Sequence, residues 1–562
     1  MIRPGSKPSS MLVLSCVFAA LTATACGGGG GSGGADNATS STPPATASTS
    51  ITPATPITPT APITPTPPAT PATPNTSTPT PTVNVAEPVI LASTASVSSA
   101  SEIASANAAA WPFQQPSIAS LRASPKKVFA HYFTPFPVSI DNKTADADYY
   151  TSQYMSPGGE GGKFAGSGGF IKQRPLPRAV MSSSTWDKLD AMQDIRRASA
   201  LGIDGFAVDL LASSGLHWDR AVRMMDMAIE VGAGFKILPM PDMEAEFKAA
   251  PENLLPALRT IAAHPAAYRL ADGRLVISPY NAQNQSVAWW SQLMQTLANE
   301  GISIAFFPVF QGWSKYAAAY APISYGVSDW GDRSPGANAG WRSAPAAAHA
   351  ANTLWMAPVS PQDSRAKDLI FWEARNSENY RVMWENAIAG GADWVQIITW
   401  NDYSEGTEIA PSSGTQWSFY DLTAYYVAWF KTGVQPTVTR DVLYYFHRVH
   451  ATSAAPSTVQ TRPYTRMPGS DAAADDIEVL AFATRAGTLR IASGSTVSER
   501  AVATGMNVVR VPLAQGTPAF EMVANGSRAA GVRSGFAIDN NIVYQDLLYR
   551  SGSSSRSLVA PR

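Results

Sequence analysis

An alternation of strand-like and helix-like segments runs from about residue 127 to about residue 431, and it constrains the fold of this chain more than any other feature. Eight runs are rich in β-branched or aromatic residues: Val128–Phe133, Gly205–Leu211, Lys236–Met240, Leu275–Tyr280, Ile304–Phe310, Ser324–Asp329, Leu354–Val359 and Trp394–Thr399. Amphipathic stretches separate them, among them Asp187–Leu201, Arg220–Val231, Leu254–His264, Val287–Asn299 and Tyr380–Ala389. Such alternation predicts βα units and a parallel sheet. We therefore expect an α/β fold, a (β/α)8 TIM barrel, over residues 116–435.

The loop after the last of these strands carries two carboxylates, Asp402 and Glu405, three positions apart. Trp400, Asn401 and Tyr403 flank them. Cleavage of a glycosidic bond needs an acid and a base, with apolar and amide surfaces for the sugar rings. We interpret Asp402 and Glu405 as the catalytic pair and the three flanking residues as substrate-binding. A solvated acidic loop is the alternative.

Polar or aromatic residues end nearly every predicted strand, which is where TIM barrels place their chemistry. His131, Asp209, Asp242 and Trp330 stand at four of these ends, and we expect them to bind substrate. At any single position, a structural cap is the alternative to a binding role. The remaining ends carry Tyr280, Asn281, Gln311, Asp329 and Ser360.

The N-terminus has the features of an export signal. Arg3 and Lys7 precede an apolar stretch that ends directly before Cys26, so residues 1–25 are predicted to be a signal peptide. Small residues before Cys26 resemble a bacterial lipoprotein processing site, although Ala23 stands where that pattern usually has Leu. We expect Cys26 to be lipidated and to anchor the chain to the outer envelope membrane. Ordinary cleavage before Cys26 and secretion are the alternative.

Low-complexity sequence follows the signal. Residues 26–115 are rich in Gly, Ser, Thr and Pro and contain few aromatic residues. Such a segment buries too little apolar surface to offset the entropy of ordering it. We therefore predict a disordered linker that acts as a semi-stiff spacer, or as an O-glycosylated stalk.

Short strand-like runs separated by glycines follow residue 435. They are Asp441–Phe446, Ile477–Phe482, Thr488–Ile491, Val508–Val511 and Phe520–Val523. This pattern predicts a β-sandwich over residues 436–550 that either binds glycan or packs against the barrel. The tail, residues 551–562, is predicted to be disordered.

Composition excludes several other kinds of site. The formal net charge is −1 and no basic block occurs, so nucleic acid is not an expected partner. The only cysteine besides Cys26 is Cys16, inside the signal, so the mature chain has no intramolecular disulfide. The six histidines form no metal-ligand pattern. We predict no metal, no cofactor and a monomer.

Several stretches resemble glycoside hydrolase family 71. They are Val128–Phe133, Gly202–Ala207, Phe235–Ile237 with Asp242 and Met243, Met356–Ser360 and Thr399–Tyr403, in the family's order. The resemblance implies an endo-acting, inverting α-1,3-glucanase, or mutanase, with a (β/α)8 barrel and a β-sandwich behind it. It implies that Asp402 and Glu405 are the catalytic pair and that Asp204 contributes to activity.

Two departures from the family pattern bear on these residues. Ser404 and Gly406 stand where the family more often has Gly and then Ser, and Asp209 stands where Asn is common. Asp204 precedes its strand on the side opposite the expected active face, so we rank Asp209 above it for substrate contact.

The resulting hypothesis is a single displacement with Glu405 as acid and Asp402 as base. A glycosidase of another linkage, such as an endo-mannanase or exopolysaccharide hydrolase, is one alternative. A polysaccharide-binding lipoprotein without catalysis is another. In each case we expect an exported protein, either secreted or held in the cell envelope.

Overall fold

The computed structural model describes residues 82–91 and 97–559. The predicted signal peptide, Cys26 and the linker as far as residue 81 lie outside the described residues, so these predictions stay predictions. The described residues belong to one unit, which runs from Thr78 to Arg562. Within the described part of the chain, no helix is long and apolar enough to cross a membrane.

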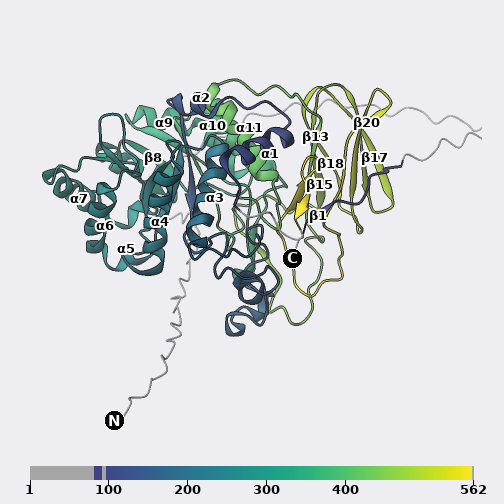
Figure 1. Cartoon of the computed structure of the whole chain (residues 1–562), viewed down its shortest axis with the longest axis horizontal. Coiled ribbons are helices and arrows are strands. Elements are labelled where there is room, and N and C mark those ends of the chain that lie inside the picture. Colours follow the sequence, from purple (N-terminus) through teal and green to yellow (C-terminus); the bar gives the residue numbers. More distant parts are fainter. Residues whose placement is uncertain (1–81, 92–96, 560–562) are drawn as a thin grey trace, which may run out of the picture. The chain divides into compact units, whose positions relative to one another are not determined.

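A curled parallel sheet forms the centre of the N-terminal part of the fold (Figure 1). Its seven strands follow the order β4-β3-β2-β12-β9-β8-β7. Their bounds are β2 (Lys127–Tyr132), β3 (Gly205–Leu210), β4 (Lys236–Pro241), β7 (Val309–Phe310), β8 (Gly326–Asp329), β9 (Leu354–Val359) and β12 (Trp394–Ile397). Residues of β12 pair on both sides, since Val395 lies in register with Val128 of β2 and with Ala357 of β9.

A shorter parallel pair, β5 (Leu275–Ile277) and β6 (Ile304–Phe306), lies between the two edge strands of this sheet. Tyr280 N donates to Pro241 O at 2.9 Å, which joins the β5 segment to β4. Val309 N donates to Pro279 O at 2.9 Å, which joins β7 to the same segment. The backbone ladder thus continues around a barrel-like circle, and every predicted strand run contains a strand. The fifth run is divided into β6 and β7.

Helices follow the strands along the chain. They are α3 (Trp186–Ala200), α4 (Gly215–Val231), α5 (Glu246–Ala249), α6 (Leu254–Ala263), α7 (Val287–Asn299), α8 (Ala317–Tyr320), α9 (Ala344–Ala350), α10 (Glu378–Gly390) and α11 (Ser418–Thr432). Short turns of other helix types are η1 (Tyr150–Tyr154), η2 (Glu160–Gly162), η3 (Ala165–Ser167), η4 (Pro251–Asn253), η5 (Ala282–Asn284), η6 (Trp313–Lys315), η7 (Ala321–Ile323), η8 (Ala337–Ser343) and η9 (Ala366–Asp368).

Helix α7 illustrates how the sequence sets these elements. Ser286 caps it, because its side chain accepts a hydrogen bond from Trp289 N. Trp290, Leu293 and Leu297 recur at helical spacing and form its buried face. Helix α11 ends at Thr432, and Gly433, which has φ +74°, caps it.

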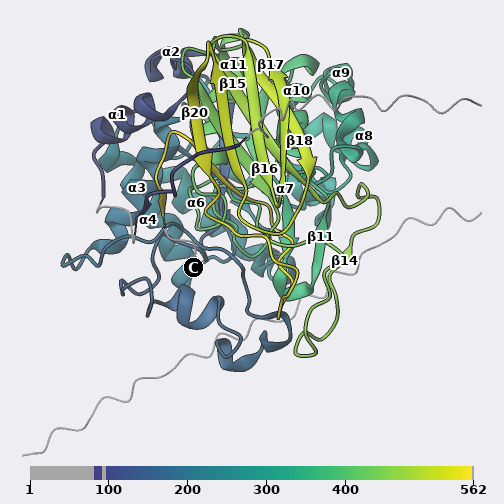
Figure 2. The same ribbon diagram turned by 90° about the vertical axis from the view of Figure 1, so that its right-hand side faces the viewer.

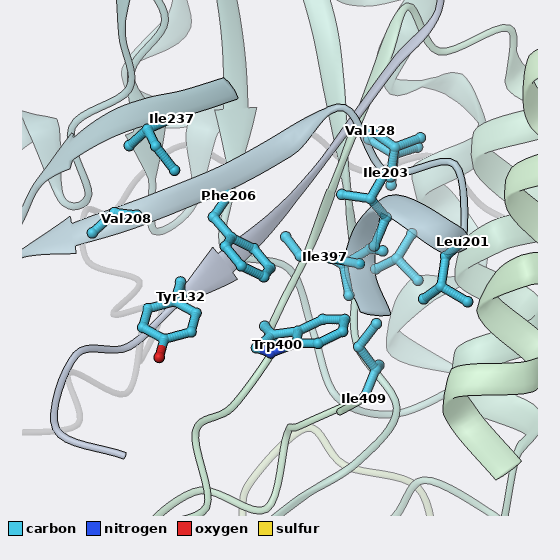
Figure 3. Close-up of a cluster of buried hydrophobic side chains, with 14 of the residues drawn as sticks. Val128, Tyr132, Leu201, Ile203, Phe206, Val208, Ile237, Ile397, Trp400 and Ile409 are labelled. Atoms are coloured by element: carbon cyan, nitrogen blue, oxygen red, sulfur yellow. The ribbon is translucent and has the colours of Figure 1, made fainter. Parts of the chain in front are cut away.

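Apolar side chains of the strands and of the loop after β12 pack into the main core. Figure 3 shows Trp400 between Phe206 and Ile409. The ring centroids of Phe206 and Trp400 are 5.2 Å apart. The loop that carries Asp402 is therefore anchored by the large buried side chain of Trp400, two positions before it.

Two antiparallel sheets form the C-terminal part of the fold (Figure 2). Their strands are β13 (Val442–His447), β15 (Asp476–Ala483), β16 (Gly487–Ser493), β17 (Thr496–Val502), β18 (Gly505–Pro512), β19 (Ala519–Ala524), β20 (Ser527–Arg533) and β21 (Arg550–Ser553). The first sheet has the order β18-β15-β13-β21 and the second β17-β16-β19-β20. Each of the five predicted strand runs overlaps one of these strands.

Residues of β13 alternate between two cores, as the period of a strand requires. Tyr445 stacks on Phe520 of the second sheet, with ring centroids 5.1 Å apart. Phe446 packs on Phe419 of α11 at 5.4 Å. The first sheet is thus covered on one face by the second sheet and on the other by α11, and the two sheets form a β-sandwich that packs against the barrel-like part.

The prediction of a disordered linker is wrong for residues 97–115. Helix α1 (Ala100–Ala110) has a complete capping box between Ser99 and Glu102. Trp111 Nε1 donates to Asp421 at 2.8 Å, and Asn107 donates to Tyr420 at 3.1 Å. The alanine-rich composition that indicated low complexity also has high helix propensity, and these tertiary contacts stabilise the helix. Helix α2 (Ile118–Ala123) follows it, and strand β1 (Ile90–Leu91) precedes it.

The predicted disorder of the tail is also wrong for residues 551–559. Ser551 belongs to β21, and β22 (Leu558–Val559) pairs with β1. Arg556 forms an ion pair with Asp421 at 2.6 Å. The polar composition of the tail concealed these pairings, because they are made to residues more than a hundred positions away.

Candidate active site

Asp402 is held by a tight turn in the loop that follows β12. Its Oδ1 accepts hydrogen bonds from Ser404 N at 2.9 Å, Ser404 Oγ at 2.8 Å and Glu405 N at 3.3 Å. Thr399 N donates to Thr407 O at 2.8 Å, which closes the base of the loop. Gly406 has φ +70°, a conformation that favours glycine. Ser404 and Gly406, at which the chain departs from the family pattern, therefore have structural roles. Ser404 supplies a hydroxyl to Asp402, and Gly406 takes the left-handed conformation.

Glu405 is paired with an arginine from another loop. Arg365 lies 3.0 Å from Glu405 Oε1. It also donates to both oxygens of Asp363, at 2.9 and 2.8 Å. Its guanidinium stacks on Trp372 at 5.0 Å. These residues belong to the hairpin of β10 (Asp363–Arg365) and β11 (Ile370–Trp372), which follows β9.

The two carboxylates have pKa values shifted in opposite directions. Burial, and then the charge of Glu405, raises the pKa of Asp402 to about 6. Burial would raise the pKa of Glu405 as well, but the charges of Arg365, Arg333 and Lys367 outweigh it, so this pKa is lowered. Asp402 is therefore the stronger candidate for a proton donor and Glu405 for a base, the reverse of the order predicted from the sequence.

Three of the predicted binding residues lie together at the ends of β2, β3 and β4. His131 Nε2 is 3.3 Å from Asp209 Oδ2. Burial, and then the charge of Asp209, raises the pKa of Asp242 to about 8. Burial lowers the pKa of His131 to about 4, although the charges of Asp402, Asp242 and Glu405 oppose it. The charges of Asp402 and Glu405 thus act on His131.

Trp330 lies in the same group and is half-buried. Its ring centroid is 5.1 Å from that of His131, with the rings perpendicular, and 4.5 Å from that of Tyr280. Asp329 fixes the loop beside it by accepting hydrogen bonds from Gly312 N at 2.8 Å and Trp313 N at 2.6 Å. An aromatic surface next to acidic groups is what a sugar ring requires.

The sequence pattern assigns no site role to several residues that belong here. Tyr280 receives a hydrogen bond from Gln311 at 2.6 Å, and the pattern identifies both only as strand ends. Arg365 and Asp363 give no signal in the sequence, because they lie in a hairpin beyond the end of β9. Their relevance follows only from the contact with Glu405.

Trp400, Asn401 and Tyr403 support the loop from inside the protein. Trp400 has no exposed surface and Tyr403 is 2% exposed. Asn401 accepts from Phe133 N at 2.7 Å and donates to Phe133 O and Phe136 O at 2.9 and 2.8 Å. Their side chains hold the loop after β12 against the loop that follows β2, and direct contact of these three residues with substrate stays a prediction.

Asp204 lies away from this group, at the start of β3. Its Oδ2 accepts from Val128 N at 2.7 Å and from Lys431 Nζ at 2.6 Å. Val128, at the start of β2, and Lys431, in α11, lie at the end of the strands opposite Asp209 and Asp242, as the position of Asp204 before its strand predicted. Asp204 therefore joins β2, β3 and α11, and its hydrogen bonds among the described residues do not reach Asp402 or Glu405.

Among the described residues, no group of three or more His, Cys, Asp or Glu side chains could hold a metal ion. The chemistry available at the site is that of carboxyl groups, one imidazole and an arginine.

A sequence model of glycosyl hydrolase family 71 matches residues 179–550. The chain belongs to this family. It is therefore a glycoside hydrolase. The match covers both the barrel-like part and most of the β-sandwich, so the two parts belong to one family unit.

Three named relatives are similar to this chain. A glucan endo-1,3-alpha-glucosidase of Schizosaccharomyces pombe is 24% identical over 406 residues, 67% of this chain and 91% of the relative. A mutanase of Penicillium rubens is 24% identical over 390 residues, 65% of this chain and 85% of the relative. The ascus wall endo-1,3-alpha-glucanase of S. pombe is 25% identical over 351 residues, 55% of this chain and 78% of the relative.

Among solved structures, the family 99 endo-alpha-mannosidase of Bacteroides thetaiotaomicron is similar, with 19% sequence identity and a TM-score of 0.42. The similarity covers 54% of this chain and 97% of the mannosidase.

Proposed function

We propose that this protein hydrolyses α-1,3-glucan within the chain, with inversion, on a (β/α)8 barrel. The observation that carries the proposal is the pair Asp402 and Glu405, which share one loop and have pKa values shifted apart. Two carboxyl groups in opposite protonation states are what an acid–base glycosidase uses. The names of the fungal relatives support α-1,3-glucan as the substrate.

In the proposed reaction, Asp402 donates its proton to the glycosidic oxygen as the bond from that oxygen to the anomeric carbon breaks. Glu405, held ionised by Arg365, removes a proton from the water that attacks the opposite face of that carbon. One displacement inverts the anomeric centre, which requires about 6.5–9.5 Å between the two carboxyl groups. His131, Asp209, Asp242 and Trp330 bind the sugar next to the cleaved bond.

We further propose that the protein is exported and acts as a monomer on a polysaccharide outside the cytoplasm. The sequence before Cys26 supports a signal peptide, and Cys26 itself supports a lipid anchor in the envelope membrane. The name of the ascus wall relative, which places that enzyme at a wall, is consistent with export.

The proposal is tested by incubating the purified protein with insoluble α-1,3-glucan and following the released sugars by NMR from the first minutes. We expect the β-anomer to appear first, and oligosaccharides to precede glucose. Asp402→Asn and Glu405→Gln should each abolish release, whereas Asp226→Asn, on the exposed face of α4, should not.

Early α-anomer would contradict inversion. If α-1,3-glucan is left intact but a mannan or another exopolysaccharide is cleaved, the proposed substrate is wrong. Glucose as the sole early product would contradict cleavage within the chain.

A further inference from the structure

Asp209 and His131 are two buried groups whose hydrogen bonds are incomplete. Asp209 is 4% exposed and His131 is 3% exposed. One atom of each makes the 3.3 Å contact between Asp209 Oδ2 and His131 Nε2. The other polar atoms, Asp209 Oδ1 and His131 Nδ1, are buried and have no partner among the described residues. Buried polar atoms are normally paired, so this pair is built to receive further hydrogen bonds.

The only ion-pair contact that Asp209 makes among the described residues is with His131, so no lysine or arginine of this part of the chain compensates a charge on it. The groups whose charges act on His131 are acidic: Asp402 and Glu405 in the loop after β12, and Asp242 at the end of β4. Burial raises the pKa of Asp209 well above its usual range. Burial also lowers the pKa of His131, which favours the uncharged imidazole over an ion pair with Asp209.

The positions of the protons determine which hydrogen bonds a neutral pair of Asp209 and His131 can form with a ligand. If Asp209 donates its proton to His131 Nε2, then Nδ1 carries a hydrogen and Asp209 Oδ1 is an acceptor. If His131 Nε2 donates instead, then Nδ1 is the acceptor and Asp209 Oδ1 carries the proton. In either arrangement, the two unpartnered atoms are one donor and one acceptor. A sugar hydroxyl, which both donates and accepts, is complementary to this combination.

We propose that Asp209 acts as a neutral carboxylic acid and, together with His131, forms a hydrogen-bonding subsite for sugar hydroxyls beside the catalytic pair. In this role, neither Asp209 nor His131 forms or breaks a covalent bond with the sugar. This inference rests on the proposed function for the identity of the sugar. Asp209 is in this respect different from Asp402 and Glu405, whose proposed roles require them to lose or gain a proton during the reaction.

The first test detects whether Asp209 is protonated, in the absence of any substrate. The infrared difference spectrum of the wild-type protein minus Asp209→Asn, recorded at pH 7, should contain the C=O stretch of a protonated carboxylic acid. A carboxylate band in its place would overturn the proposal. Asp226→Asn is the matched control, because this exposed carboxyl group should give a carboxylate band.

The second test compares two variants on soluble α-1,3-linked oligosaccharides. Asp209→Asn keeps the size and a neutral donor and acceptor, so kcat/KM should fall less than about tenfold. Asp209→Ala leaves a sugar hydroxyl unpaired, and kcat/KM should fall about a hundredfold. Thermal unfolding of both variants checks that the fold is intact.

A loss in Asp209→Asn as complete as in Asp402→Asn would show that Asp209 must be charged and would overturn the proposal. Asp209→Ala with the activity of the wild type would also overturn it. If the wild type cleaves no α-1,3-glucan, the proposed function fails by itself, while the infrared band still decides whether Asp209 is neutral.

Discussion

The guanidinium of Arg365 lies 3.0 Å from Oε1 of Glu405, so a residue outside the loop after β12 lowers the pKa of a proposed catalytic carboxyl group. A third strand, β14 (Thr465–Arg466), pairs with β11 of the hairpin that carries Arg365. Strand β14 belongs to a loop of the C-terminal part. The β-sandwich is therefore connected to the active site through backbone hydrogen bonds, and it is more than a separate accessory module.

Arg365→Gln removes the cation that lowers the pKa of Glu405. A base must be ionised to act, so activity rises as the pH passes its pKa. Because this pKa increases in the variant, the acidic limb of the kcat/KM profile should move to higher pH by about one unit or more. Arg365→Lys, which keeps the charge, should shift it less. Arg259→Gln, whose partner Glu300 is on the surface, is the control. An unmoved limb would contradict the role of Glu405 as base.

Ser404→Ala removes the hydroxyl that donates to Asp402 at 2.8 Å. That hydrogen bond favours the ionised carboxylate, so its loss raises the pKa of Asp402 above about 6. An acid stays protonated up to its pKa, and the alkaline limb of kcat/KM should therefore move to higher pH by roughly half a unit. Ser291→Ala in α7 should leave the profile unchanged. A shift to lower pH would show that Asp402 is not the proton donor.

Gly406→Ala places a Cβ against Leu548 and a side chain at φ +70°. The left-handed conformation alone costs about 1–3 kcal/mol. We expect a lower Tm together with a lower kcat, because the turn that holds Asp402 is displaced. The double variant with Leu548→Ala relieves the clash but not the backbone conformation, so it should recover only part of the Tm. Full recovery would show that φ is unimportant at this position.

Lys431→Met leaves Asp204 buried and without its cation. Breaking a buried ion pair costs about 3–5 kcal/mol, so the free energy of unfolding should fall by that order in a denaturant titration. Because both residues lie at the end of the strands opposite the catalytic pair, kcat per folded molecule should be unchanged. A large loss of kcat in a folded variant would return Asp204 to the active site.

Arg556→Gln tests whether the contacts of the C-terminal tail stabilise the folded protein. Arg556 pairs with the buried Asp421 and donates to Asn107 of α1 at 2.9 Å. Removing it should lower the free energy of unfolding by about 3–5 kcal/mol. It should also increase amide hydrogen exchange in both α1 and β22. A variant as stable as the wild type would mean that the tail does not hold the structure together.

The amino-acid pattern was sufficient for the elements of the barrel-like part and for the group at the strand ends. Runs such as Val128–Phe133 are identified by local side-chain period, and residues at their ends share one face of a parallel sheet. The strand pattern alone therefore groups His131, Asp209 and Trp330. It does not indicate which carboxyl group is the proposed base, since that proposal depends on Arg365, which a hairpin brings to Glu405 from 40 positions earlier in the chain.

Local pattern by itself determined the strands, the helices and the presence of two carboxylates after the last strand of the sheet, because each of these depends on neighbours within a few residues. Only the tertiary structure decided which side chains are covered. Trp400 could have stacked on a sugar, yet it is enclosed by Phe206 and the core, and α1 and the tail are ordered by contacts with Asp421. Burial and charge at a site are sums over groups that are distant in sequence, and for this reason the ionisation of Asp402, Glu405 and Asp209 is a property of the fold.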